Sequence, residues 1–492
     1  MTKQAPTDTA TTTGLYYGGA DHDAGETFDV PDPSRSGALA GRAAAATREQ
    51  ALDAVAAARD AFPAWSARPA AERAALLREA AAAVLASVEE DAAVLSAENG
   101  KIVQECAIDL YVFAHRVGLA CDLAAHVDEA TVLEGPPVES TVRYQPLGVV
   151  SIIVPFNWPA AILGASLPYA LVAGNTTVVK PPPSAPLATA RMVRRFAEKL
   201  PPGVVNVVTG RDADIGEALV DNPDVDKVCF TGSVGGGRRI MGMAARNLTR
   251  VTLELGGNDP AVFLPDAPMD DDSLDNIFHG VFDTTGQICM NAKRIYVHRA
   301  RRDELVAGLT ARLEKVVLGR GTDPGTTMGP LNSPDQARYV VDLIEEARAA
   351  GAEVREFGEL PGGELASGNF VRPALVLDPD PALRIVTEEQ FGPAIPIMAF
   401  DDVDEAVAAA NDTWAGLCAS VWTADPATAH AVGARLRAGY VFHNTHGAAH
   451  LDQRAPFGGV KSSGFGREMG LEGLREFMDT HTVGILQEQP RH

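Results

Sequence analysis

The chain has 492 residues, of which 46% are hydrophobic and 22% are charged, a composition typical of a globular protein with roughly two to four domains. The 65 acidic residues exceed the 42 basic ones, and the net charge of −23 argues against nucleic acid and anionic membranes as partners. No apolar run is long enough to cross a bilayer, and the Thr-rich start lacks the basic-then-apolar order of a signal peptide. We therefore expect a cytoplasmic protein without a membrane segment.

The cysteines are scattered and never form a CxxC pair. They are Cys106, Cys121, Cys229, Cys289 and Cys418. An odd number without close spacing predicts neither a disulfide framework nor a cysteine-based zinc site, and we expect no metal. Most of them are expected to be small buried hydrophobes in a reducing cytosol.

The first 30 residues are interpreted as a loose arm or an edge strand, and two helical stretches follow. Thr47 to Gln50 has the pattern of a capping box at the start of the first helix. The second helix is predicted from about 70 to 98 and ends at Asn99-Gly100, a C-terminal signal.

From Val149 onward, short apolar runs alternate with helical patterns. This alternation predicts a parallel, doubly wound sheet. The predicted strands are 149–154, 176–180, 204–208, 227–231 and 251–255, and the helices are 160–172, 187–199, 215–220 and one that opens after Ser233.

A second region repeats the strand–helix alternation, so the fold class is α/β with two such sheets. Its predicted strands are 261–264, 294–298, 395–400, 419–422 and 440–444, and its clearest helices are 401–410 and 427–438. The segments 131–144 and 480–486 fit neither sheet. They are candidates for a subunit contact, with simple edge strands as the alternative.

A glycine-rich turn stands where the strand 227–231 becomes a helix. Gly232 permits close backbone approach, and the free N–H groups of the helix that follows suit a phosphate. A tight turn that merely needs glycine is the alternative. Lys180, at the end of its strand and followed by three prolines, is either a phosphate or ribose partner or a solvated lysine.

Three further residues stand at element ends where chemistry is favoured. Cys289 follows an apolar helix in a polar, Gly-interrupted segment, where a thiol can act as a nucleophile. Glu254 ends a buried strand before two glycines and is either a general base or an ion-paired residue. The Asn157 amide, in a rigid aromatic turn, is a candidate hydrogen-bond donor to an oxyanion.

Together these motifs resemble the aldehyde dehydrogenase superfamily, and the resemblance covers nearly the whole chain. The matching stretches are Pro155–Pro159, Val179–Pro181, Phe230–Ser233, Leu253–Gly257, Gly286–Cys289, Glu388–Pro393 and Pro456–Gly464. The resemblance implies two doubly wound Rossmann-like domains plus a small β oligomerisation flap. It places an NAD(P)-binding domain at 1–130 and 147–257, a catalytic domain at 258–445, oligomerisation strands at 131–146 and 478–492, and a segment closing the active site at 446–477.

The resemblance also implies a role for each matching residue in hydrolytic, non-CoA-acylating aldehyde oxidation. Cys289 matches the nucleophile, Asn157 with the Cys289 backbone N–H matches the oxyanion hole, and Glu254 matches the base that activates water. The residues that match cofactor contacts are Ile153, Phe156, Lys180, Gly232, Ser233, Leu255, Glu389 and Phe391. Those assigned to the substrate pocket are Trp158, Met290 and Phe457.

Two features depart from the family pattern. Many members carry a ribose-binding glutamate at the position of Pro183, and proline can neither accept those hydrogen bonds nor repel a phosphate. NADP is therefore an open alternative, while NAD remains the default cofactor. The loop 444–456 borders the substrate entrance in the family and here contains His446, His450, Asp452 and Arg454. Arg454 favours an acidic semialdehyde in one interpretation and is a plain surface arginine in the other.

Two rival functions remain within this resemblance. The CoA-acylating branch generally lacks the hydrolytic glutamate, so Glu254 counts against it. A catalytically silent structural or binding homologue would have lost Cys289 or Glu254, and both residues are present. The expected partners are a small aldehyde and a second copy of the chain, because family members are usually homodimers or homotetramers.

Overall fold

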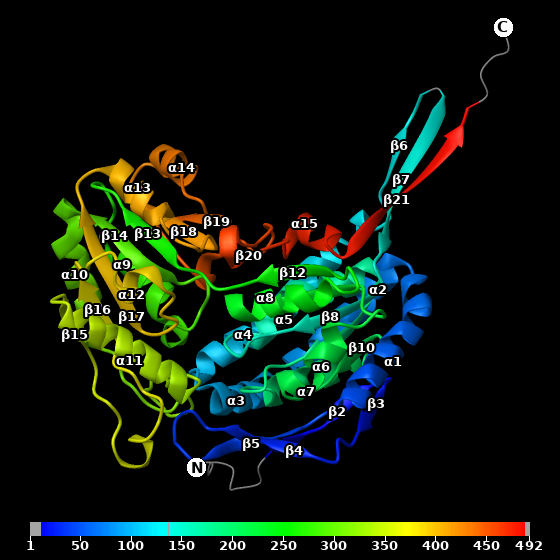
Figure 1. The fold of residues 1–492 in the computed structure, drawn as a ribbon, viewed down its shortest axis with the longest axis horizontal. Coiled ribbons are helices and arrows are strands. Elements are labelled where there is room, and N and C mark those ends of the chain that lie inside the picture. Colours follow the sequence, from blue (N-terminus) through cyan, green and yellow to red (C-terminus); the bar gives the residue numbers. More distant parts are fainter. Residues whose placement is uncertain (1–10, 136, 488–492) are drawn as a thin grey trace.

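The computed structural model describes residues 11–135 and 137–487, so residues 1–10 and 488–492 of the expected domains lie outside the described residues. Two large sheets, each with helices on both faces, form the body of the molecule, and a narrow three-stranded flap projects from it (Figure 1). The α/β prediction with two doubly wound sheets is therefore confirmed.

Eight strands of the described chain form the first sheet. Their order is β20 (Gly464–Phe465), β12 (Arg250–Glu254), β11 (Lys227–Thr231), β8 (Val149–Ile153), β9 (Thr176–Lys180), β10 (Val205–Val207), β2 (Leu15–Tyr17) and β3 (Ala20–His22). The strands from β12 to β10 are parallel, and β20 and β2 pair antiparallel at the two sides. The N-terminal arm thus contributes edge strands, one of its two predicted forms.

Alternating side chains of the first sheet enter two separate cores. Val150 and Ile152 pack under one layer of helices, whereas Val149 and Ile153 pack under the other. This explains the continuous apolar run, because a strand covered on both faces needs no polar side. The helices concerned are α1 (Arg48–Ser66), α2 (Ala70–Leu85), α3 (Val88–Asn99), α4 (Val103–Asp122), α5 (Pro159–Ala173), α6 (Leu187–Ala197), α7 (Asp212–Val220) and α8 (Val234–Ala244).

Helix starts and stops follow the local sequence, with one difference. Thr47 forms the predicted capping box with Gln50, and Gly100 ends α3 at φ +90°. The single helix predicted from 70 to 98 is wrong, because Ser87 leaves helical geometry at φ −122° and separates α2 from α3. Serine favours helix ends since its hydroxyl competes for backbone hydrogen bonds.

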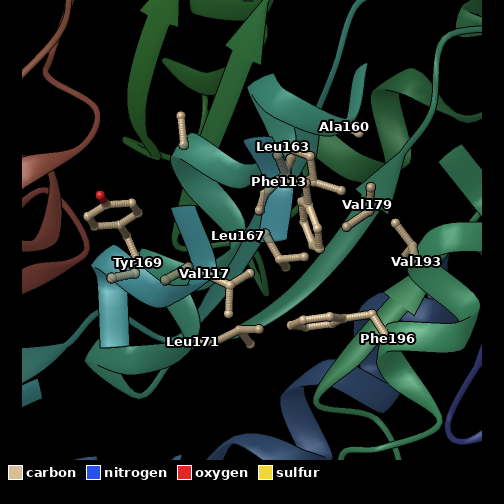
Figure 2. Packing of buried hydrophobic residues seen from close by; sticks show 14 of the residues in the cluster. Phe113, Val117, Ala160, Leu163, Leu167, Tyr169, Leu171, Val179, Val193 and Phe196 are labelled. Atoms are coloured by element: carbon tan, nitrogen blue, oxygen red, sulfur yellow. The ribbon is translucent and has the colours of Figure 1, made fainter. Parts of the chain in front are cut away.

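One part of the hydrophobic core lies between α4, α5, α6 and β9 (Figure 2). Phe113 of α4 meets Phe196 of α6 edge-on, with ring centroids 5.5 Å apart. Leu163 and Leu167 of α5 fill the space beside them. This packing fixes the start of α5, which directly follows the Asn157 turn.

Seven strands of the described chain form the second sheet. Their order is β15 (Glu353–Glu356), β16 (Ala374–Leu377), β17 (Ala394–Phe400), β14 (Ala292–His298), β13 (Asp259–Phe263), β18 (Cys418–Trp422) and β19 (Tyr440–His443). All pairs are parallel except β15 with β16. The helices around it are α9 (Asp271–Phe282), α10 (Arg299–Leu313), α11 (Pro334–Ala349), α12 (Arg384–Thr387), α13 (Val403–Asn411) and α14 (Pro426–Gly433).

The remaining strands form two small sheets. The flap consists of β6 (Ala130–Leu133), β7 (Val138–Pro146) and β21 (Met478–Leu486), all antiparallel, and α15 (Gly470–Arg475) precedes β21. Beneath the first sheet, β1 (Thr11–Thr13), β5 (Leu39–Ala44) and β4 (Thr27–Pro31) pair (Figure 1). Among the described residues, no helix has the length and apolar character needed to traverse a bilayer.

Candidate active site

A cavity of about 1010 Å³ opens where the parallel strands of the first sheet end. Its wall includes the last residues of β8, β9, β11 and β12 and, from the second half of the molecule, the Cys289 loop and the Glu389–Phe391 segment. Ligands collect at this edge of a parallel sheet. All catalytic and cofactor candidates from the sequence line this cavity: Ile153, Phe156, Asn157, Lys180, Gly232, Ser233, Glu254, Leu255, Cys289, Glu389 and Phe391.

The glycine turn before α8 is shaped for close approach to the backbone. The Ser233 hydroxyl accepts the Gly236 N–H at 3.1 Å and caps the helix. A Cβ atom on Gly232 would stand 2.6 Å from the Phe230 ring, so a larger residue there would require the ring to move. A helix N-terminus with a positive dipole end therefore faces the cavity, and this arrangement fits the pyrophosphate of a dinucleotide.

Lys180 is buried at the end of β9, with 1% of its side chain exposed, so it is not the solvated lysine of the alternative interpretation. Its ammonium pairs with the carboxylate of Asp212, the first residue of α7. Asp212 lines the same cavity, as does Pro183. The cavity therefore has an ion pair at this end.

The loop that carries Cys289 is held in an uncommon backbone conformation. Thr284 and Thr285 both adopt φ +56°, a left-handed conformation that costs free energy for a β-branched residue. Downstream of the thiol, the Lys293 ammonium donates to the carbonyl oxygens of Ile288 at 2.6 Å and Asn291 at 3.0 Å. These contacts fix the turn between the nucleophile candidate and β14.

Cys289 is a free cysteine, and although the residue as a whole is partly exposed, its thiol is surrounded by protein. Burial raises its pKa to about 12, and the Lys293 ammonium opposes that shift. Nearby carboxylates, Glu389 first among them, add to the rise. In the ligand-free chain the thiol is therefore protonated at neutral pH.

Asn157 is positioned by the same loop. Its Nδ2 donates one N–H to the carbonyl oxygen of Gln287 at 2.8 Å. An amide nitrogen has two N–H groups, so this bond leaves one for another acceptor. The side chain is buried, with 3% exposed, and its orientation is fixed in advance of any ligand.

Glu254 ends β12 with its carboxyl group in the cavity wall, and 4% of the residue is exposed. Within the described residues, neither of its oxygens has a hydrogen bond of regular geometry, although Arg467 and the Gly459 N–H are close enough to lower the pKa of the carboxyl group in part. Burial raises its pKa well above the usual range, and the nearby Glu468 carboxylate raises it further. A carboxyl group without an ion-pair partner in the cavity that the Cys289 thiol also lines is available for proton transfer, so among the described residues the ion-paired alternative for Glu254 does not hold.

Glu389 and Phe391 close the cavity opposite the glycine turn. The Glu389 carboxylate accepts the Gly257 N–H at 3.1 Å, and a Cβ on Gly256 would overlap that carboxylate. Burial raises the pKa of Glu389 to about 7. Phe391 adopts φ +46° and meets the Phe156 ring edge-on at 6.1 Å.

The substrate-pocket candidates Trp158, Met290 and Phe457 do not line this cavity. They belong to the hydrophobic cluster against which Cys289 packs. The Trp158 indole N–H donates to the Thr284 hydroxyl at 2.9 Å, which links it to the nucleophile loop.

The loop 444–456 contributes less positive charge to the substrate side of the site than its histidines and arginine suggest. His446 is 2% exposed, its Nδ1 lies 2.8 Å from the Ser420 hydroxyl, and burial lowers its pKa to about 3. Arg454 is largely exposed and makes two contacts of 2.9 Å with Asp452. The structure therefore favours the surface-arginine interpretation over recognition of an acidic aldehyde.

Sequence reasoning missed several residues of the cavity wall. They are Asp212, Glu217, Arg239 and Met243 at one end, and Gln336 and Tyr339 at the other. Asp212 had a usable signal, because it begins the helix that comes after strand β10 of the parallel sheet, but the helix was predicted to start at 215. Gln336 and Tyr339 lie on α11 of the other sheet, and no local pattern places them here.

Three comparisons place this geometry among known proteins. The aldehyde dehydrogenase family model matches residues 20–483. The betaine aldehyde dehydrogenase of Bacillus subtilis is 35% identical over 444 residues, which is 89% of each chain. A solved NAD-dependent aldehyde dehydrogenase from Sinorhizobium meliloti superposes with a TM-score of 0.93 at 33% identity, covering 99% of this chain and 98% of that one. A solved E. coli NADP-dependent enzyme gives 0.92 at 31% identity, covering 97% and 98%.

Proposed function

This chain belongs to the aldehyde dehydrogenase family, and from that premise we propose how its residues oxidise an aldehyde to a carboxylic acid with NAD(P)+. One observation carries the assignment. Cys289, Asn157 and Glu254 come from three separate segments and line one cavity together with the glycine turn of α8. A thiol, an amide donor and an unpaired carboxyl group are the groups that acyl chemistry through a thioester requires.

In the first half-reaction, the Cys289 sulfur attacks the aldehyde carbon and the thiol proton is released to solvent water. The free Asn157 N–H and the Cys289 backbone N–H stabilise the resulting oxyanion. A bound NAD(P)+ would supply the acceptor for the hydride of the carbon that Cys289 has attacked. The acyl group is then a thioester on Cys289.

In the second half-reaction, Glu254 takes a proton from water, and the hydroxide adds to the thioester carbon. The C–S bond then breaks, the carboxylic acid leaves, and the thiol is restored. Burial raises the pKa of the Glu254 carboxyl, which makes its ionised form a stronger base toward water than an ordinary carboxylate. This Glu254 step distinguishes hydrolysis from CoA acylation.

For the cofactor, we assign Lys180 to the adenosine ribose, Gly232 and Ser233 to the pyrophosphate, and Glu389 with Phe391 to the nicotinamide ribose. Ile153, Phe156 and Leu255 form the apolar wall. We also propose that residues 1–130 and 147–257 form the domain that binds the cofactor, and that residues 258–445 form the domain that contains the nucleophile. The unpaired cysteines support a reducing, cytoplasmic location.

Trp158, Met290 and Phe457 are assigned to the aldehyde side. They are apolar and belong to, or pack against, the same hydrophobic cluster as Cys289, so they favour an uncharged aldehyde chain over an acidic one. Because Arg454 is paired with Asp452, no observation supports a semialdehyde as a second candidate.

The flap supports assembly into a homodimer or homotetramer. Both faces of its sheet expose large apolar side chains, namely Val132, Leu133, Val138, Val483, Ile485 and Leu486. Such a patch on an extended arm is typical of a subunit contact. Light scattering after size exclusion tests it: Ile485→Glu should yield monomers, whereas Leu360→Glu, which replaces an exposed leucine elsewhere, should leave the assembly unchanged.

The enzymatic proposal is tested by a panel of aliphatic, aromatic, amino and acidic aldehydes with NAD+ and NADP+. The readouts are the absorbance of the reduced nicotinamide and the amount of carboxylic acid formed. Added coenzyme A should not change the product. Formation of an acyl-CoA would show that the chain belongs to the acylating branch, and absence of turnover with every aldehyde would refute the activity.

A further inference from the structure

The end of the cavity that is assigned to the adenosine ribose differs from that of many relatives at position 183. Where many relatives have a glutamate that binds the ribose hydroxyls and disfavours a 2′-phosphate, this chain has Pro183, which has no carboxylate. On that residue alone, NADP would be accepted as readily as NAD. Pro183 nevertheless lines the cavity beside two charged residues that alter this expectation.

Those residues are Lys180 and Asp212. Lys180 is buried and its ammonium is in contact with the Asp212 carboxylate. Asp212 keeps 78% of its side chain exposed in spite of that contact, and it lines the cavity. The carboxylate is therefore held by the lysine assigned to the ribose while it stays open to a ligand.

We propose that Asp212 supplies the ribose-selecting carboxylate that Pro183 lacks, and that it makes NAD the preferred cofactor. This inference rests on the proposed NAD(P)-dependent function. A 2′-hydroxyl can donate a hydrogen bond to the Asp212 carboxylate. A 2′-phosphate carries about −1.5 to −2 charges at neutral pH and would meet that carboxylate as a like charge.

The other charged groups at this end do not remove the effect. Glu217 also lines the cavity and adds a second negative charge, although Arg246 lies 3.5 Å from it. Arg239 of α8 is exposed and lines the cavity, and it is the group that would attract a 2′-phosphate. We assign Asp212 and not Glu217 to the ribose, because Asp212 is in contact with Lys180, which is itself assigned to the ribose.

Helix α7 provides a matched control. Asp212 and Asp214 both stand in its first turn, so replacing either with asparagine removes one negative charge from the same helix end. Only Asp212 lines the cavity. A change in cofactor selectivity that appears with Asp212→Asn and not with Asp214→Asn comes from the cavity carboxylate and not from the net charge.

The test is equilibrium binding of NAD+ and NADP+ without aldehyde, measured by titration calorimetry. Asp212→Asn should tighten NADP+ binding by about tenfold or more and weaken NAD+ binding severalfold, while Asp214→Asn changes both by less than about twofold. Asp212→Ser repeats the test with a residue that also suits a helix start. Adding Pro183→Glu to Asp212→Asn should restore discrimination against NADP+.

Three results would overturn the inference. The first is an NADP+/NAD+ affinity ratio that Asp212→Asn and Asp212→Ser leave within twofold of the unmodified chain. The second is an equal shift with Asp214→Asn. The third is an unmodified chain that prefers NADP+ and loses that preference with Arg239→Gln. If the unmodified chain binds neither dinucleotide, the proposed function itself fails, and the binding curves separate that outcome from the others.

Discussion

The Lys101 ammonium and the Asp109 carboxylate form an ion pair of 2.9 Å in which neither side chain is exposed. The pair contacts the segment that follows Asn157, at Trp158 and Ala161. The other Asp109 oxygen accepts the Ala161 N–H at 2.6 Å in the first turn of α5, and the Lys101 ammonium stands 4.1 Å over the Trp158 ring. Asn99 donates to the Phe156 carbonyl at 3.2 Å. The end of α3 and the start of α4 thus support the segment that presents Asn157.

Breaking this ion pair should destabilise the protein strongly. Lys101→Met leaves the Asp109 carboxylate buried without its partner, which typically costs about 3 to 5 kcal/mol. We expect a lower midpoint of urea unfolding. Replacing both partners, with Lys101→Met and Asp109→Leu, should recover part of the loss. A midpoint for Lys101→Met equal to that of the unmodified chain would show that the pair contributes little.

Cys289→Ala should abolish aldehyde oxidation and leave NAD+ affinity within about twofold, because the thiol forms the bond to substrate while the cofactor contacts lie elsewhere. Turnover and titration calorimetry measure the two effects. Cys229→Ala is the control, since Cys229 is buried in the first sheet and should be dispensable. More than a few per cent of residual activity in Cys289→Ala would contradict the covalent mechanism.

The pH dependence of Cys289 alkylation should report its raised pKa. With a pKa of about 12, the thiol is neutral at physiological pH, and raising the pH ionises it. The rate of iodoacetamide labelling in the ligand-free protein should therefore rise about tenfold per pH unit from roughly pH 7 to 10. Peptide mapping would assign the label to Cys289. A rate that levels off near pH 8.5 to 9, as for an ordinary thiol, would refute the shift.

The sequence predicted most of the fold because local patterns determine it. Thr176–Lys180 and Lys227–Thr231 match their predicted strands at both ends, since both combine β-branched and apolar residues and are bounded by turn residues. Helix α4 is missing from the prediction, because buried Asp109 and Arg116 interrupt its apolar face. Hydrogen bonds of these two side chains to the backbone of α5 offset the free-energy cost of burying their charges. Tertiary packing overrides local pattern at such positions.

The candidate site divides in the same way. Cys289, Glu254 and Asn157 stand in recognisable motifs at strand or loop ends, so their common location follows from the parallel sheet. The role proposed for Asp212 depends on its ion pair with Lys180, which stands 32 positions away in the sequence. No motif predicts that contact. The neutral state of His446 likewise results from burial against Ser420, which its loop position does not reveal.

Glu254→Gln should separate the two half-reactions. If Glu254 acts only in hydrolysis, the variant still allows attack by Cys289 and hydride transfer, and the acyl group then stays on sulfur because an amide is a poor base. Rapid mixing should give a burst of NADH close to one per active site, followed by very slow turnover. Intact-mass analysis should find the acyl adduct on the Cys289 peptide.

The burst rate carries a second piece of information. Glu254 also raises the pKa of the Cys289 thiol, so its neutral replacement favours the thiolate electrostatically, whereas loss of a proton acceptor slows thiol deprotonation. A slower burst of full amplitude means that Glu254 assists acylation as well. If neither burst nor adduct forms, and Asn157→Ala behaves alike, Glu254 acts in the acylation step. Steady turnover near the unmodified rate would instead mean that another group activates the water, and the nearby Glu468 carboxylate would be the first to replace.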